Sequence, residues 1–212
     1  LKAVYKNMNQ DEIIKNTAIA ISKGQAVGWF QGRMEYGPRA LGNRSIIADP
    51  RSESMQKILN LKVKFRESFR PFAPSILREE LEKWFDLDCD SPYMLLVAKV
   101  KKELCTFFSN KDKNNTQGIQ KLYLKKSIIP AVTHVDYTSR IQTVHIETNP
   151  LYYKLISKFY ELTGCPILVN TSFNVRGEPL VCSPEDAFNC FMGTELDLLV
   201  IDNFYLEKNN QT

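Results

Sequence analysis

The chain has 212 residues, of which 43% are hydrophobic and 25% charged, and its formal net charge is +4. These values are ordinary for a soluble globular protein with a real core, and no apolar run approaches the roughly 20 residues of a membrane helix. No basic-then-apolar signal segment opens the chain. It begins at Leu1 rather than Met, which indicates a processed chain or a piece of a longer protein.

In chain order, apolar spacing and turn residues predict a helix over 11–23, strands over 26–30 and 45–50 with a short helical turn from Pro38 to Gly42 between them, and a helix near 52–61. A strand over 73–77, a helix reaching residue 85 and a strand over 93–100 follow.

An exposed loop is predicted over 101–115, followed by the basic, partly amphipathic stretch IQKLYLKKSI at 119–128. A helix over 150–162, a strand over 166–173, a helix starting at Pro184 with Ser183 as its cap, and a long final strand over 196–208 complete the order. Strands and helices mix without repeats or a low-complexity linker, so the predicted class is α/β or α+β with a mixed sheet.

The cysteines are odd in number and form no CxxC pair, which favours free thiols in a reducing cytoplasm. They are Cys89, Cys105, Cys165, Cys182 and Cys190. The two histidines, His134 and His145, have no close metal-ligand spacing, so no transition-metal site built by this chain is expected.

The positive charge is concentrated in one stretch. Residues Arg33 to Arg70 carry a net charge of +5, whereas the rest of the chain carries −1. A compact excess of this kind favours a local anion site over a uniformly basic nucleic-acid binder.

The stretch FQGRMEYGPRALGNRSIIADPR, residues 30–51, combines arginines with glycines that permit close backbone approach. Guanidinium groups suit phosphate or carboxylate. The stretch matches neither the P-loop pattern nor GxGxxG. The alternative is a set of surface arginines paired with Glu35 and Asp49.

The stretch KVKFRESFRPFAPS, residues 62–75, alternates basic and aromatic residues. In an extended chain its basic residues share one face and could follow phosphates, while the aromatic residues anchor the strip in the core. These basic residues are Lys64, Arg66 and Arg70. The alternative is a solvated basic strand at the edge of a sheet.

The stretch HVDYTSRIQTV, residues 134–144, places Arg140 after a Thr-Ser pair and before an apolar strand. In one interpretation Arg140 binds an anion, and the hydroxyls of Thr138 and Ser139 form hydrogen bonds with it. His134 is a candidate general base, although a packed or capping histidine is the favoured alternative.

The stretch VNTSFNVRGEP, residues 169–179, carries a buried strand into polar residues, where open α/β sheets gather ligands. These are Asn170, Thr171, Ser172 and Asn174. The alternative is a polar turn whose side chains only cap backbone groups. No GxSxG elbow surrounds Ser172, so it is not interpreted as a hydrolase nucleophile.

Together, GWFQGRMEYGPRALGNRSIIADPR, KFRESFRPFAPS, HVDYTSRIQTV and ILVNTSFNVRGEPLVCSPEDA resemble the C-terminal domain of the carbamoyltransferases of antibiotic and nodulation-factor biosynthesis. The resemblance runs from about residue 13 to residue 208. Tyr137 departs from the family, which usually has a small residue there, and its bulk is expected to narrow the pocket near Arg140. Residues 101–127 match no motif.

The resemblance implies a YrdC-like α/β fold, an open twisted mixed sheet with flanking helices and a basic concave face, formed by a single domain over residues 1–212. This domain would bind ATP and carbamoyl phosphate and form carbamoyl-adenylate. A separate N-terminal domain of the actin-like ATPase superfamily, carrying Fe or another metal and absent from this chain, would transfer the carbamoyl group to an acceptor hydroxyl.

The family's ligand residues fall on six positions of this sequence: Arg39, Lys64, Arg70, Arg140, Asn170 and Ser172. Lys64, Arg70 and Arg140 are assigned to phosphate and carbamoyl oxygens as the catalytic groups, and Arg39 to the nucleotide or carbamoyl phosphate. Asn170 and Ser172 are assigned to the carbamoyl end or the α-phosphate. Mg²⁺ would accompany ATP, held mostly by phosphates and water. The remaining arginines of the first stretch, Arg33, Arg44 and Arg51, are expected to be structural.

Two other functions remain open from the sequence. One is synthesis of threonylcarbamoyl-adenylate for transfer-RNA modification, and the other is a non-catalytic RNA-binding module that holds a phosphodiester backbone. The expected partners are ATP, carbamoyl phosphate and the N-terminal domain, in the cytoplasm. A homodimer stays open, a nucleic-acid partner is disfavoured and no membrane partner is expected.

Overall fold

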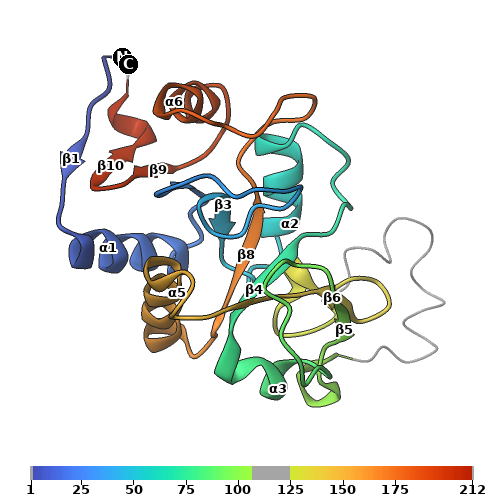
Figure 1. The fold of residues 1–212 in the computed structure, drawn as a ribbon. Coiled ribbons are helices and arrows are strands. Elements are labelled where there is room, and N and C mark those ends of the chain that lie inside the picture. Colours follow the sequence, from blue (N-terminus) through green and yellow to red (C-terminus); the bar gives the residue numbers. More distant parts are fainter. Residues whose placement is uncertain (1, 107–124, 212) are drawn as a thin grey trace.

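A computed structural model describes residues 2–106 and 125–211 (Figure 1). Residues 107–124 lie outside the described residues. They include the second part of the predicted loop and most of the basic stretch after it. The part described before it contains a short 3₁₀ helix, η3 (Lys102–Leu104).

A large mixed sheet forms the centre of the fold. Its strands run in the order β1-β10-β9-β2-β3-β8-β4-β7. The bounds are β1 (Lys6–Asn7), β2 (Val27–Phe30), β3 (Arg44–Ala48), β4 (Ala73–Leu77), β7 (Gln142–Val144), β8 (Ile167–Ser172), β9 (Leu198–Ile201) and β10 (Phe204–Glu207). The pairs β2–β9 and β4–β7 are parallel and the others antiparallel, which confirms the predicted mixed sheet. A second, two-stranded antiparallel sheet joins β5 (Val97–Lys99) to β6 (Thr138–Arg140).

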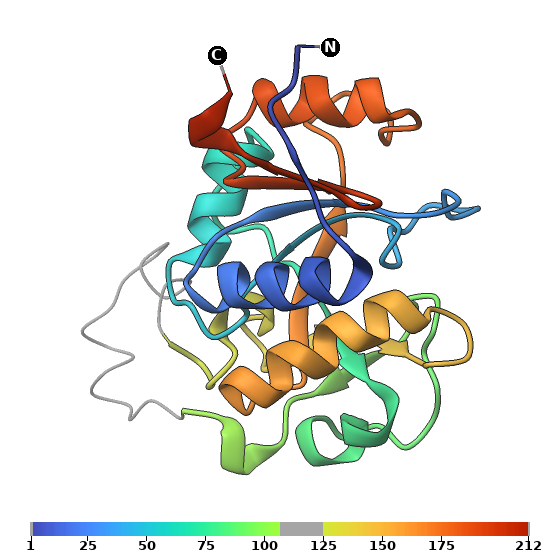
Figure 2. The ribbon, with the colours of Figure 1, turned by 90° about the vertical axis from the view of Figure 1, so that its left-hand side faces the viewer.

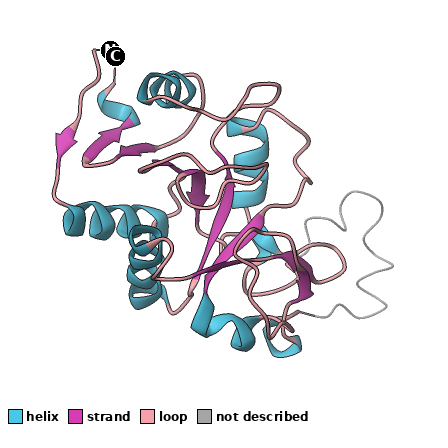
Figure 3. Ribbon diagram, in the orientation of Figure 1, coloured by secondary structure: helices cyan, strands magenta, loops and turns pink. Residues whose placement is uncertain are grey.

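Helices flank the large sheet, as predicted. The two longest, α1 (Gln10–Ser22) and α5 (Pro150–Thr163), lie side by side, and α6 (Pro184–Met192) is separated from them by strands β9, β10 and β2 (Figure 2). Figure 3 shows how short the remaining helices are. They are α2 (Met55–Ile58), the π-helix η1 (Leu59–Val63), α3 (Leu81–Trp84), and the 3₁₀ helices η2 (Arg78–Glu80), η5 (Pro130–Val132) and η6 (Lys208–Asn210).

Local sequence signals set the helix ends. Ser183 and Asp186 form a reciprocal capping box at the start of α6, with Pro184 at the first helical position. Gly164 ends α5 in the left-handed conformation, with φ of 71°. These are the caps that the sequence predicts.

Strands β2, β3, β4 and β8 are buried along most of their length, because they occupy the middle of the sheet. Their side chains and those of α1 and α5 form one continuous core that includes Trp29, Tyr152, Phe159 and Phe173. None of the helices in the described ranges has the length and apolar character of a membrane-spanning segment.

The predicted long strand over 196–208 is wrong, because the segment is a hairpin. β9 ends at Ile201 and β10 begins at Phe204. Asp202 between them has φ of 47°, a conformation in which aspartate is one of the better tolerated residues. The continuous apolar pattern hid this turn.

Three other local predictions are also corrected. The segment Lys64–Arg70 is not an extended strip, because it follows η1 and Phe65 has φ of 47°. The strand predicted over 93–100 is confined to β5, since Met94 has φ of 56°. No helical turn forms between Pro38 and Gly42. The backbone N–H of Leu41 donates to Glu35 in the same loop, and the Ala40 carbonyl accepts from Asn170 on β8.

Gly42 is expected to be indispensable for stability. Its φ is 109°, and an added Cβ would lie 2.3 Å from Cδ1 of the buried Tyr152 ring. Gly42→Ala should therefore lose about 3–5 kcal/mol in free energy of unfolding, measured in urea, from backbone strain and overpacking combined.

The matched control is Gly37→Ala, because Gly37 has φ of 124° with open space around its would-be Cβ. Gly37→Ala should lose only the part of the free energy of unfolding that comes from backbone strain, about 1–2 kcal/mol. Equal losses in the two variants would show that the Tyr152 contact is unimportant.

Candidate anion site

The loop between β2 and β3, residues 31–43, is held by one carboxylate and one guanidinium. Glu35 Oε1 accepts hydrogen bonds from the backbone N–H groups of Leu41 and Asn43, both at 2.7 Å. The Arg44 guanidinium donates to the carbonyls of Gln31, Gly32 and Asn43 and stacks on the Phe30 ring. Both Nη atoms of Arg44 are thus occupied by loop carbonyls, in agreement with the structural role expected for it, although its Nε is buried without a partner among the described residues.

Hydrogen bonds from two side chains of the sheet hold the same loop. Asn170 Nδ2, on β8, donates to the Ala40 carbonyl at 3.0 Å, and Gln142 Nε2, on β7, donates to the Leu41 carbonyl at 2.8 Å. Asn170 is 1% exposed. Both carbonyls follow Arg39 directly in the chain, so the backbone beside Arg39 is fixed by two buried side chains.

Arg39 and Arg140 lie close to one another without a carboxylate between them. Burial lowers the pKa of Arg140, and the nearby charge of Arg39 lowers it further. Neither arginine forms an ion pair with a carboxylate within the part of the chain that the structure describes, and Nε of each is buried without a hydrogen-bond partner there. Two like charges in this state form an arrangement that an anion would stabilise.

Lys64 is brought to the carboxyl end of β8. It is 4% exposed, and its Nζ donates to the Ser172 carbonyl and, at 2.8 Å, to the Asn174 carbonyl. It also lies 3.3 Å from Ser172 Oγ. Burial lowers the pKa of Lys64 to about 7, and the charge of Arg66 contributes to that shift. No carboxylate pairs with this ammonium among the described residues.

β8 connects these two clusters. Asn170 and Ser172 are two residues apart on the strand, so they project to the same side, about 7 Å apart. Asn170 contacts the loop that carries Arg39, and Ser172 contacts Lys64. Four of the six predicted site residues therefore lie on β8 or on segments that it contacts, and Arg140 joins them through its proximity to Arg39.

Arg70 stands apart from this group. Its side chain is 52% exposed, and its Nε lies 3.4 Å from Oε2 of Glu67. Its backbone is fixed, however, because its carbonyl accepts hydrogen bonds from Gln56 and Asn60. Arg66, which was not assigned to the site from the sequence, is more buried than Arg70 and donates to Asn60 Oδ1 at 2.6 Å.

The residues around Arg140 are engaged within the protein. Ser139 Oγ donates to the Val132 carbonyl and Thr138 Oγ1 to Asp136, so the interpretation that gave these hydroxyls to an anion is not supported. His134 is half-buried, and burial lowers its pKa, as expected for the packed histidine. The Tyr137 hydroxyl donates to the Thr106 carbonyl at 3.3 Å.

Sequence reasoning missed two residues that organise the site, Gln142 and Ser75, and it named Asn174 only as one of the polar residues at the strand end. Asn174 Oδ1 accepts hydrogen bonds from Lys64 and Ser172. Gln142 and Ser75 are polar residues inside otherwise apolar, buried strands, and that position was the available signal.

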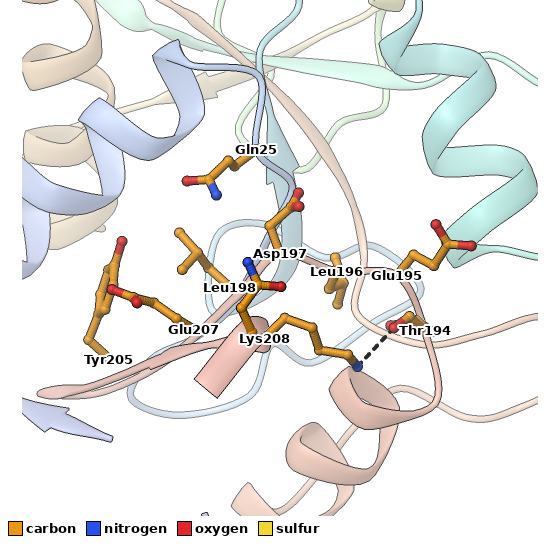
Figure 4. Close-up of a pocket in the computed structure, with 10 residues that line it drawn as sticks. Gln25, Thr194, Glu195, Leu196, Asp197, Leu198, Tyr205, Glu207 and Lys208 are labelled. Atoms are coloured by element: carbon orange, nitrogen blue, oxygen red, sulfur yellow. Dashed lines mark hydrogen bonds between the residues drawn. The ribbon is translucent and has the colours of Figure 1, made fainter. Parts of the chain in front are cut away.

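A cavity of about 430 Å³ lies elsewhere, between β9, β10 and the end of α6 (Figure 4). Lys208 reaches across it and donates to the carbonyls of Met192 and Thr194, both at 2.9 Å. A lysine on the last carbonyls of a helix is a cap. None of the predicted site residues lines this cavity.

Comparison with known families gives a match over most of the chain. The family model described as "Carbamoyltransferase C-terminus" matches residues 18–208. An uncharacterized protein of Synechocystis is 56% identical over 211 residues, which cover 100% of this chain and 34% of that protein.

Several relatives have functional names, among them a nodulation protein and an O-carbamoyltransferase. The nodulation protein NolO of Bradyrhizobium diazoefficiens is 42% identical, with 93% of this chain and 33% of that protein covered. The 3'-hydroxymethylcephem-O-carbamoyltransferase of Streptomyces clavuligerus is 36% identical, with 88% of this chain and 31% of that enzyme covered. The chain spans about a third of the length of the curated relatives it matches.

Two solved structures share the fold. HypF, crystallised in a phosphate- and nucleotide-bound form, matches with a TM-score of 0.55 and 17% identity over 91% of this chain and 25% of HypF. Sua5 of P. abyssi, crystallised with L-threonine, matches with a TM-score of 0.56 and 16% identity over 95% of this chain and 49% of Sua5. These similarities confirm the predicted YrdC-like architecture.

Lys64 should make stability depend on pH in a defined window. Its pKa is about 7 in the folded chain and about 10.5 when unfolded, so the unfolded state binds more protons between these values. The contribution of Lys64 to stability is therefore constant below pH 7 and rises with pH from 7 to 10.5, by at most about 1.4 kcal/mol per pH unit.

Urea unfolding at pH 7, 8.5 and 10 checks this expectation. The wild-type chain should gain stability relative to Lys64→Met as pH rises, whereas the exposed-site control Lys57→Met should follow the wild type. Other titrating groups, such as the buried Cys165 thiol, are common to all three proteins. Parallel curves for Lys64→Met and wild type would contradict the assignment.

Proposed function

Because the chain belongs to the carbamoyltransferase C-terminus family, we propose that it binds ATP and carbamoyl phosphate and forms carbamoyl-adenylate. With water, the balance of this reaction gives carbamoyl-adenylate, pyrophosphate and phosphate. The named O-carbamoyltransferase among the relatives supports a carbamoyl group as the moiety transferred.

The observation that carries the proposal is that, among the described residues, no carboxylate pairs with three of the predicted cations. Arg39 and Arg140 adjoin each other, and Lys64 is buried at the end of β8. Formation of an adenylate concentrates negative charge on the α-phosphate and the leaving pyrophosphate. Guanidinium and ammonium groups held in place stabilise such charge without reorganising.

Each predicted residue has a chemical role in this proposal. Arg39 would contact the nucleotide or carbamoyl phosphate, and Arg140 and Lys64 would contact phosphate and carbamoyl oxygens. Asn170 and Ser172 would hold the carbamoyl end or the α-phosphate. The exposed Arg70 would contact a phosphate only by turning from Glu67, a weak surface ion pair.

Magnesium would enter with the nucleotide. The described residues contain no group of three His, Cys, Asp or Glu side chains that could hold a metal ion. The ion would therefore be held by phosphate oxygens and water, which suits its reluctance to lose its hydration shell. When bound, it would neutralise part of the phosphate charge.

In this proposal, transfer of the carbamoyl group to the acceptor requires a longer protein that contains this chain as one domain. The matched relatives are about three times as long as this chain. We propose that residues 1–212 act as one adenylate-forming domain and that an actin-like, metal-carrying domain transfers the carbamoyl group to an acceptor hydroxyl.

The competing product is threonylcarbamoyl-adenylate. The Sua5 structure contains L-threonine, but its likeness to this chain concerns the fold alone. The family match favours the carbamoyl product. Formation of a threonine-containing adenylate from threonine, bicarbonate and ATP, with none from carbamoyl phosphate, would reverse this choice.

Nucleotide binding by the chain is the direct test. Calorimetric titration should show binding of ATP with Mg²⁺ and of carbamoyl phosphate, and Arg140→Ala should weaken ATP binding about 10–100-fold, the value of a charge-assisted hydrogen bond.

The matched control is Arg78→Ala, because Arg78 pairs with Asp90 and follows β4 near the start of β8, at the opposite end of that strand from Asn170 and Ser172. It should bind ATP like the wild type. A chain that binds neither ligand, or an Arg140→Ala variant with wild-type affinity, would count against the proposal. A salt-dependent gel shift with RNA and no turnover would favour an RNA-binding module instead.

A further inference from the structure

Gln142 occupies a central position among the elements that carry the site. It is the first residue of β7, is 4% exposed and follows Arg140 by two residues. Neither its type nor its place in RIQTV marks it as a ligand residue. Its contacts nevertheless reach three separate parts of the fold.

The Gln142 carboxamide uses both of its ends. Nε2 donates to the Leu41 carbonyl at 2.8 Å, in the loop that carries Arg39. Oε1 accepts a hydrogen bond from Ser75 Oγ, on β4, at 2.5 Å and one from Asn170 Nδ2, on β8, at 2.8 Å. One buried side chain thus connects the Arg39 loop, β4 and β8, and its own strand, β7, begins two residues after Arg140 ends β6.

The orientation of this cluster is fixed by two groups that can only accept. The carbonyls of Ala40 and Leu41 each require a donor, so Asn170 and Gln142 must both turn their amide nitrogens toward the loop. Gln142 Oε1 then faces Ser75 and Asn170. The remaining group is Asn170 Oδ1, a buried acceptor with no partner among the described residues.

The hydrogen bonds of this cluster also counteract the electrostatic repulsion between Arg39 and Arg140. Arg39 and Arg140 carry like charges close together, and no carboxylate pairs with either among the described residues. Before an anion binds, this repulsion favours displacement of the Arg39 loop from the sheet. The hydrogen bonds from Gln142 and Asn170 to the loop backbone counteract that displacement.

We infer that Gln142 is a positioning residue of the anion site. It holds Arg39, Arg140 and Asn170 in the relative arrangement that binds the phosphate-bearing substrates, without contacting them itself. This inference rests on the proposed function, because it assigns Gln142 to the same site.

Two substitutions separate its contributions. Gln142→Leu removes both ends of the amide. Gln142→Glu keeps an acceptor for Ser75 and Asn170 but replaces the donor to the Leu41 carbonyl with an oxygen. Both should weaken binding of ATP and of carbamoyl phosphate about 10–100-fold in calorimetry, since a misplacement near 1 Å has effects of that size.

The matched control is Thr194→Val. Thr194 is also buried, and its Oγ1 donates to a backbone carbonyl, that of Cys190 in α6. This variant loses the same kind of hydrogen bond away from Arg39. It should retain affinity within about twofold, although its thermal stability falls like that of Gln142→Leu.

A double-mutant cycle with Arg39→Ala distinguishes positioning from a general loss of structure. If Gln142 acts through Arg39, Gln142→Leu should weaken ATP binding much less in the Arg39→Ala background than in the wild type. A structural defect would give the same fold-change in both backgrounds.

The outcomes are distinct. Absence of ATP and carbamoyl phosphate binding by the wild-type chain would overturn the proposed function and this inference together. Binding by the wild type, with Gln142→Leu matching Thr194→Val or with additive effects in the cycle, would overturn the inference alone. If both Gln142 variants fail to fold by circular dichroism, Ser75→Ala, which removes the donor to Gln142 Oε1, replaces them in the same cycle and is judged by the same two results.

Discussion

The arrangement of the candidate site depends on two hydrogen bonds between the sheet and a loop. Asn170 and Gln142 donate from buried strands to the carbonyls of Ala40 and Leu41, and Glu35 accepts from the N–H groups on the other side of the same backbone. These hydrogen bonds hold the backbone of a loop that has no regular secondary structure. The site needs this constraint, because an arginine presented by a mobile loop binds anions less selectively.

The cations of the site differ physically from the other basic residues of the same stretch. Arg44 donates through both Nη atoms to loop carbonyls, with Nε left without a partner among the described residues, and Arg51 donates to the Asp49 carboxylate. Arg39, Arg140 and Lys64 are partly or fully desolvated without a carboxylate among the described residues. Desolvation without compensation lowers the stability of the folded chain. Cations in this state would be stabilised by an anion that the chain does not itself supply, which is the basis of the proposed function.

Short-range rules anticipated much of the fold. The positions of α1, α5 and α6 follow from apolar spacing and from caps such as Ser183 and Gly164, which are local in sequence. Errors occurred where a positive φ interrupts an apolar or alternating pattern, as at Phe65, Met94 and Asp202. Such conformations are maintained by tertiary contacts, so residue type alone gives little warning of them.

The sequence by itself determined the residue types of the site, the concentration of positive charge between Arg33 and Arg70, and the motifs that carry the family resemblance. Only the tertiary structure decided which cations are compensated, that Lys64 reaches the end of β8, and that Gln142 and Ser75 orient Asn170 toward the loop. The reason is physical: charge and hydrogen-bonding capacity belong to each side chain, but whether they are satisfied depends on neighbours that are 67–130 residues away in the chain, as in the Ser75–Gln142 and Ala40–Asn170 contacts.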